Sequence, residues 1–149
     1  MIFASCLWGR SRAAEEKRKI ALLSEFISFV SFTGEYIVRF KAPLSEIYSE
    51  YTPELPEMKR FIASAREKDI KTAWNVSPPP LPSKAERTAE KFVNELGSGY
   101  AEEEREKCAC TVDILGKLLA ELKSDMADRV KMWHSLPPLL VSSVLLIFL

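Results

Sequence analysis

The sequence predicts an all-α protein, an antiparallel helical bundle whose long last helix leads into a membrane segment. Apolar residues recur every three or four positions over most of the chain, which is the period of a helix with one buried face. Proline, glycine and capping residues separate these periodic stretches, as expected where helices start and stop. The C-terminal stretch 132–149 carries no formal charge when histidine is counted as neutral.

Composition limits the classes of function. The chain has 149 residues, about one domain, and its 47% hydrophobic content is enough to build a core. Lys+Arg and Asp+Glu are both 21, so there is no basic excess of the kind that a dedicated nucleic-acid binder needs. One histidine and three cysteines leave little material for a metal or catalytic centre.

The first long helix is predicted from its apolar residues, which fall in two adjacent helical rows before Pro43. These rows are Ile20, Leu23, Ile27, Val30, Gly34, Ile37 and Leu22, Phe26, Phe29, Thr33, Tyr36, Phe40. A strand over residues 26–40 is the alternative, but that stretch is too long for one strand and has no hairpin turn. The helix should end before Pro43, because a residue that precedes proline is pushed out of the α region.

Proline and capping residues divide the next part of the chain into short helices. Pro43 can open one that runs to Glu50. Thr52 then caps a helix with Pro53 at its first position, running to about residue 68. Asp69 caps a further short turn that holds Ile70, Ala73 and Trp74.

The proline-rich segment 77–82 is a loop, read as a stiff connector with an SH3-type ligand as the alternative. Ser83 and Glu86 form a capping-box pattern that opens a helix, and Gly97 is placed to end it.

The longest helix begins after Gly99 and carries a seam that is nearly a heptad repeat. The seam residues are Cys108, Val112, Leu115, Leu119, Leu122, Met126, Val130 and Trp133. Pro137 is its first interruption. The chain is accordingly divided into a short apolar segment, 1–9, a cytoplasmic helical domain, 10–136, and an anchor, 137–149, whose helix can be continuous from residue 132.

The two ends are the candidate membrane segments. Residues 139–149 would extend only about 16 Å as a helix, which is shorter than a bilayer core of about 30 Å. The alternative is an apolar C-terminal helix that packs on the domain. If the tail inserts, Trp133 lies near the headgroups and the basic Arg129 and Lys131 lie on the cytoplasmic side. Residues 1–9 are followed by positive charges, unlike a secretory signal, and read as a truncated membrane segment or a short interfacial anchor.

No residues form a recognisable active site. Cys108 and Cys110 are two apart on a helix and so point away from each other, which favours reduced structural thiols over a metal site or a disulfide. His134, beside two prolines, is a poor phosphotransfer residue. We therefore expect no catalytic residue, no metal and no cofactor.

Two features are candidates for roles in binding and in stability. The possible partner surface is the acidic start of the last helix, formed by Glu102, Glu103, Glu104 and Glu106, although these residues also suit the helix dipole. The side chain of Trp74 is expected to be buried in the bundle, where it fills the space between the long helices.

The ordered motifs resemble the stage III sporulation protein AB family over nearly the whole chain. Pro43-Leu44-Ser45-Glu46 resembles that family's PL-x-E segment, and Thr72-Ala73-Trp74 its AW element. Leu96-Gly97 followed by Glu102 resembles its LG-x-x-D-x-E-x-Q element, although Tyr100 and Glu104 depart from it. Lys131-Met132-Trp133-His134-Ser135-Leu136 resembles its KMY-x-SLG ending, with Pro137-Pro138 in place of a glycine-containing stretch.

The resemblance implies a non-enzymatic, membrane-anchored component of a sporulation channel between mother cell and forespore. It implies a cell-membrane location with the helical domain on the mother-cell side, similar to the cytoplasmic domain of type II secretion and type IV pilus platform proteins. Its partners would be other stage III proteins, including the associated motor ATPase; a homo-oligomer is left open. The alternative is an unrelated tail-anchored helical adaptor.

Overall fold

The computed structural model describes the backbone of residues 2–40 and 43–148 and the side chains of residues 10–40 and 43–129. The fold is all-α: helices make up 84% of the chain, and the described residues contain no strand. The chain separates into two compact units, Met1–Leu119 and Ala120–Leu149. The wider bundle arrangement and the predicted boundaries at residues 9 and 136 stay predictions.

The first unit is built around the long first helix, α1 (Ile2–Phe40), which ends before Pro43 as predicted. Its two apolar rows supply much of the core, including Leu22, Leu23, Phe26, Phe29 and Val30, all 0% exposed. The strand alternative for residues 26–40 is wrong. The stretch is helical because its apolar positions recur at helical spacing, which places them together on one broad buried face.

Three short helices cover α1: α2 (Leu44–Glu50), α3 (Pro56–Glu67) and α4 (Ile70–Val76). Both α2 and α3 contact α1, and α3 packs along α4. Asp69 caps α4 as predicted, because its side chain accepts the Thr72 N–H at 2.6 Å. That hydrogen bond holds the pKa of the Asp69 carboxyl below its usual range.

The predicted start of α3 is wrong. The helix begins at Pro56 with Leu55 as its extended N-cap residue, not at Pro53 after Thr52. The carboxylate of Glu25 on α1 accepts the N–H groups of Glu54, at 2.5 Å, and Leu55, at 3.1 Å. These hydrogen bonds satisfy two backbone donors outside the helix, so the chain can stay extended until the second proline.

The proline-rich loop is a packed connector between α4 and α5 (Ser83–Glu95), because Pro79 and Leu81 are both buried. The capping box predicted for Ser83 is wrong. Pro82 is the N-cap residue and no side chain caps the helix, because Ser83 already lies in its first turn. Pro82 supplies its carbonyl to the N–H groups of Ala85 and Glu86 instead.

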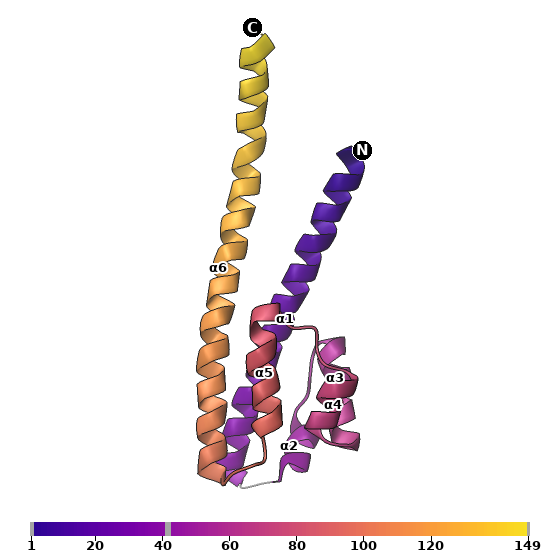
Figure 1. The fold of residues 1–149 in the computed structure, drawn as a ribbon, viewed down its shortest axis with the longest axis vertical. Coiled ribbons are helices and arrows are strands. Elements are labelled where there is room, and N and C mark those ends of the chain that lie inside the picture. Colours follow the sequence, from indigo (N-terminus) through magenta and orange to yellow (C-terminus); the bar gives the residue numbers. More distant parts are fainter. Residues whose placement is uncertain (1, 41–42, 149) are drawn as a thin grey trace. The chain divides into compact units, whose positions relative to one another are not determined.

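The last helix, α6 (Ala101–Phe148), begins after Gly99 as predicted. Its backbone is helical through Pro137 and Pro138, in agreement with a helix that is continuous from residue 132. Within the first unit, Cys108 and Leu115 of the predicted seam are buried and Val112 is half-buried. The start of α6 runs in the opposite direction to the second half of α1 (Figure 1), and Gly34 meets Cys108 where they approach.

Among the residues whose side chains the structure describes, one helical stretch, Arg10–Phe40, is long and apolar enough to cross a membrane. Half of its apolar window is buried inside the protein, and the core helix of a soluble protein has the same character. The stretch is therefore weak evidence for membrane association. The side chains of the predicted anchors at residues 1–9 and 137–149 lie outside those that the structure describes.

Candidate functional site

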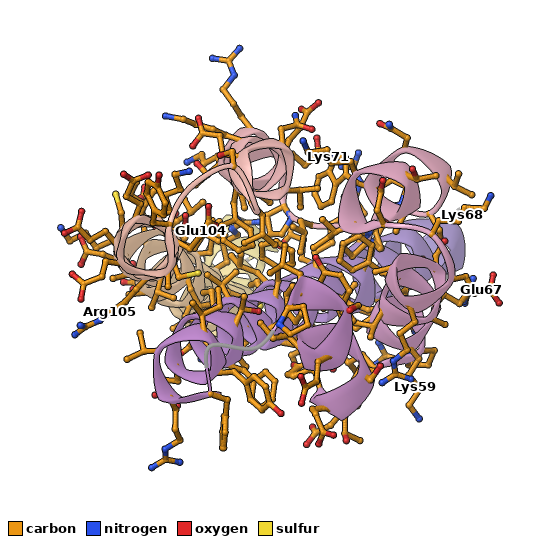
Figure 2. The ribbon with its side chains drawn as sticks, turned by 90° about the horizontal axis from the view of Figure 1, so that it is seen from below. Lys59, Glu67, Lys68, Lys71, Glu104 and Arg105 are labelled. Atoms are coloured by element: carbon orange, nitrogen blue, oxygen red, sulfur yellow. The ribbon has the colours of Figure 1, made fainter. Side chains whose placement is uncertain are left out.

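The acidic start of α6 divides into one buried and three exposed glutamates. Glu104 is only 4% exposed, and its carboxylate accepts the N–H groups of Gly97, at 3.2 Å, and Gly99, at 2.9 Å. Lys107 donates to the same carboxylate at 3.4 Å. The inclusion of Glu104 in the predicted partner surface is therefore wrong, because its buried carboxylate holds the turn between α5 and α6. In Figure 2, Glu104 lies inside the fold whereas Arg105 points outward.

The other three glutamates, Glu102, Glu103 and Glu106, are exposed and stay the predicted partner surface. Tyr100, 83% exposed, lies just before them. We call Tyr100, Glu102, Glu103 and Glu106 the acidic face. Because the Glu104 carboxylate holds the turn from Gly97 to Gly99, the backbone at the start of the acidic face is fixed. The acidic face is chemically suited to a basic partner, and both Glu102 and Glu103 also lie in the first turn, where carboxylates favour the helix dipole.

Gly97 is placed as predicted, directly after Leu96, the C-cap residue of α5. Its φ is +89°, a conformation that favours glycine, and a Cβ there would lie 3.0 Å from Cδ1 of Leu44. Leu44 therefore brings the start of α2 against the turn between α5 and α6. Pro43, itself exposed, opens α2 by accepting the N–H of Glu46 at 3.1 Å.

Trp74 is half-buried rather than fully buried. Its ring lies against Phe26 of α1 and Phe61 of α3, with centroid separations of 6.3 and 6.0 Å. It therefore joins α4 to one long helix and one short one. The side chains of the remaining sequence-predicted positions, Met132 and Trp133, lie outside the described residues.

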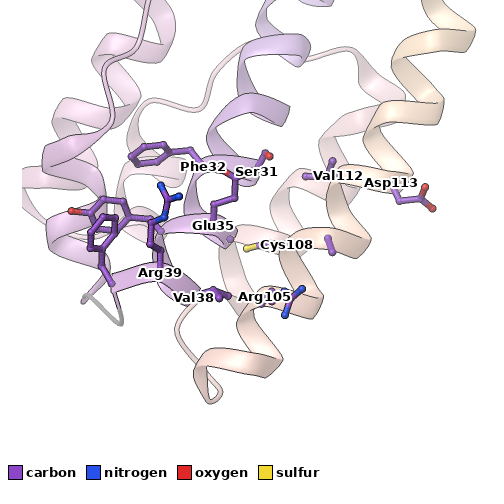
Figure 3. Close-up of a pocket in the computed structure, with 13 residues that line it drawn as sticks. Ser31, Phe32, Glu35, Val38, Arg39, Arg105, Cys108, Val112 and Asp113 are labelled. Carbon is purple, nitrogen blue, oxygen red and sulfur yellow. The ribbon is translucent and has the colours of Figure 1, made fainter.

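A groove between the second half of α1 and the start of α6 was not predicted from the sequence (Figure 3). It has a volume of about 980 Å³ and is open to solvent. Small residues, Ser31, Gly34 and Ala109, contribute to its lining. Charged side chains come from both helices: Glu35 and Arg39 from α1, and Arg105 and Asp113 from α6. Ser31 and Gly34, two small residues three positions apart in an otherwise bulky apolar helix, are the signal that could have indicated it.

The groove contains a cysteine whose thiol is buried. Its cysteine, Cys108, is 2% exposed, and burial, reinforced by the nearby negative charge of Glu104, raises the pKa of the thiol to about 12. The thiolate, which is the nucleophilic form, is therefore suppressed at neutral pH. Among the described residues, no group of three His, Cys, Asp or Glu side chains could hold a metal ion.

Glu25 and Arg66 are two structural residues that sequence reasoning missed. Arg66 of α3 donates to the carbonyl oxygens of Tyr48, at 2.5 Å, and Tyr51, at 2.8 Å, and so satisfies the end of α2. Burial raises the pKa of the Tyr51 phenol to about 12, and its hydroxyl donates to the Glu25 carbonyl at 3.4 Å. These contacts join residues that are far apart in sequence, so no local sequence pattern predicts them.

Comparison with known proteins gives no relative for this chain. No protein-family model matches it, and neither the curated proteins nor the solved structures contain a significantly similar chain.

Proposed function

We propose that this chain is a non-enzymatic, membrane-associated helical scaffold that binds other proteins. The observation that carries the proposal is the acidic face on α6. Its three exposed carboxylates follow directly after a turn that the buried Glu104 holds in place. Exposed carboxylates on a rigid support can pair with a basic partner and steer its approach. Catalysis would instead require an activated nucleophile or an acid–base pair, and the buried Cys108 thiol has the wrong pKa for that role.

The specific setting that we propose is a sporulation channel between mother cell and forespore. This part rests on the ordered motifs that resemble the stage III sporulation protein AB family. In that setting, the partners are other stage III components, including the motor ATPase, and the helical domain faces the mother-cell cytoplasm. The bound partner would contribute the basic surface.

A membrane experiment tests the anchoring. Full-length protein should sediment with membranes and resist high salt, because apolar insertion is not screened by ions. Deleting residues 139–149 should release most of it if the tail is the main anchor. A truncated protein that stays in the membrane pellet without aggregating would move the anchor to the N-terminal helix, whose Arg10–Phe40 stretch is the other candidate.

A binding experiment tests the acidic face. We expect the double change Glu102→Lys and Glu106→Lys to weaken capture of the motor ATPase or another stage III component, with helicity unchanged by circular dichroism. The matched control is Glu86→Lys with Glu90→Lys, two exposed carboxylates with the same spacing on α5. Equal capture by both variants and the unchanged protein would remove the acidic face, and the exposed Lys59, Arg60 and Glu67 of α3 would be the next surface to change.

The second candidate function is an unrelated tail-anchored adaptor, which the same exposed carboxylates of α6 would serve. The two differ in their genomic setting and in their partners. A neighbouring secretion-type ATPase with a row of small membrane proteins supports the scaffold, whereas capture of proteins outside such a cluster supports the adaptor.

A further inference from the structure

The groove between α1 and α6 carries charges that are not used within the described part of the chain. Glu35 and Arg39 on α1 and Arg105 on α6 are exposed. None of the three forms an ion pair with another described side chain, whereas Asp113, further along α6, pairs with Lys117 at 3.2 Å. Unpaired charges on both sides of a groove are available to an occupant.

Two of these charges lie at the same level on opposite sides. The two helices run in opposite directions, and Gly34 faces Cys108: a Cβ added at Gly34 would lie 3.0 Å from Cβ of Cys108. Glu35 is one residue beyond Gly34, and Arg105 is three residues before Cys108, toward the same end. At about 1.5 Å per residue, they lie within about 3 Å of one level, yet they do not meet across the groove.

The shape of the groove fits a helix. It follows more than two turns of α1, from Ser31 to Phe40, and a similar length of α6, from Arg105 to Asp113. The small side chains of Ser31, Gly34 and Ala109 let another backbone come close, and Val38 leaves 45% of its surface exposed at the edge. An occupant helix would cover that apolar surface.

We propose that the groove receives α1 of a second copy of this chain, so that two copies form a two-fold dimer. In this arrangement each α1 enters the groove of the other copy, and Glu35 of each copy meets Arg105 of the other. The contact is self-complementary in charge, as a two-fold interface must be. The two copies also point the same way, as anchoring in one membrane requires. Only this relative orientation rests on the proposed anchoring.

Charge exchange tests the contact. Full-length protein in mild detergent should show a concentration-dependent dimer in sedimentation equilibrium. Glu35→Arg or Arg105→Glu alone places like charges opposite each other and should weaken association about tenfold or more. The double variant should recover it, because the pair is restored with its signs exchanged. The control is Glu90→Arg, an exposed glutamate of α5 that lies outside both the groove and the acidic face, which should dimerise normally.

A steric variant gives an independent measurement. Ala109→Trp fills the groove from an exposed position and should abolish the dimer while circular dichroism stays unchanged. A chain that remains monomeric, or a double charge variant no better than the single ones, overturns the proposal. Capture of stage III components by such a monomer would leave the proposed function standing, whereas a dimer that captures none would contradict only that function.

Discussion

The carboxylate of Glu104 accepts the backbone N–H of Gly97 at 3.2 Å and thereby ties the first turn of α6 to the end of α5. The same carboxylate accepts the Gly99 N–H at 2.9 Å and is reached by Lys107. One buried side chain thus satisfies two backbone donors of a turn that has no regular hydrogen-bonding partner for them. The acidic face depends on this support, because it begins directly after the turn.

We expect Glu104→Ala to destabilise the protein by about 1–3 kcal/mol, because two backbone donors lose a charged acceptor in a part-buried site. The matched control is Glu103→Ala, the exposed neighbour, which should stay within about 0.5 kcal/mol. Thermal unfolding followed by circular dichroism measures both. Equal melting temperatures for the two variants would contradict the structural role assigned to Glu104.

Gly97 and Gly116 should respond in opposite directions to the same substitution. Gly97→Ala forces a side chain into φ +89° and against Leu44, at a cost of about 1–2 kcal/mol. Gly116 lies inside α6, and a Cβ there would meet nothing within 4 Å, so Gly116→Ala should gain about 0.5–1 kcal/mol. Denaturant titration of both variants checks the sign. A loss at Gly116 would show that its environment is closer than the structure indicates.

Local signals in the sequence predicted the elements whose ends depend on adjacent residues. Asp69 caps α4 and Gly97 follows the end of α5, because one side chain or one φ value decides each boundary. The start of α3 could not be predicted in the same way. Pro53 and Pro56 are both acceptable first residues, and the choice between them follows from the contact of Glu25 with Glu54 and Leu55.

The candidate sites were predictable only in part, for a similar physical reason. Four glutamates in a run of five residues look alike in sequence, and only the fold of the turn between α5 and α6 shows that Glu104 alone turns inward. The groove depends on how α1 and α6 are aligned, which places Gly34 opposite Cys108. Helical periodicity gives the faces of both helices but not their alignment.

Trp74→Ala should lower stability by about 2–4 kcal/mol, somewhat less than for a fully buried tryptophan, because the ring is half-buried. The loss comes from the contacts with Phe26 and Phe61 that connect α4 to α1 and α3. Trp74→Phe keeps an aromatic ring and should recover much of the loss. The melting temperature is the measurement, and an unchanged value for Trp74→Ala would reassign Trp74 to a partner surface.

The two cysteines of α6 should differ sharply in reactivity toward a thiol reagent. Cys110 is exposed, whereas Cys108 is 2% exposed and burial raises the pKa of its thiol to about 12. In a Cys6→Ser background, we expect one thiol to react rapidly at neutral pH and the second only on unfolding. Cys110→Ser should remove the rapid reaction with the reagent, and Cys108→Ser should leave it unchanged. Rapid reaction of both thiols in the folded protein would contradict the burial of Cys108.

The same thiol makes stability depend on pH in a defined direction. The folded-state pKa of Cys108 is raised above its ordinary value of 9.0, so the folded state holds the proton more tightly than the unfolded chain does. Its contribution to stability is therefore complete below pH 9 and is lost progressively as the pH rises from about 9 toward 12. Between these values, Cys108→Ala should show a shallower loss of stability than the unchanged protein, because alanine has no proton to release. Parallel pH curves for the two proteins in this range would show that Cys108 ionises as it does in the unfolded chain.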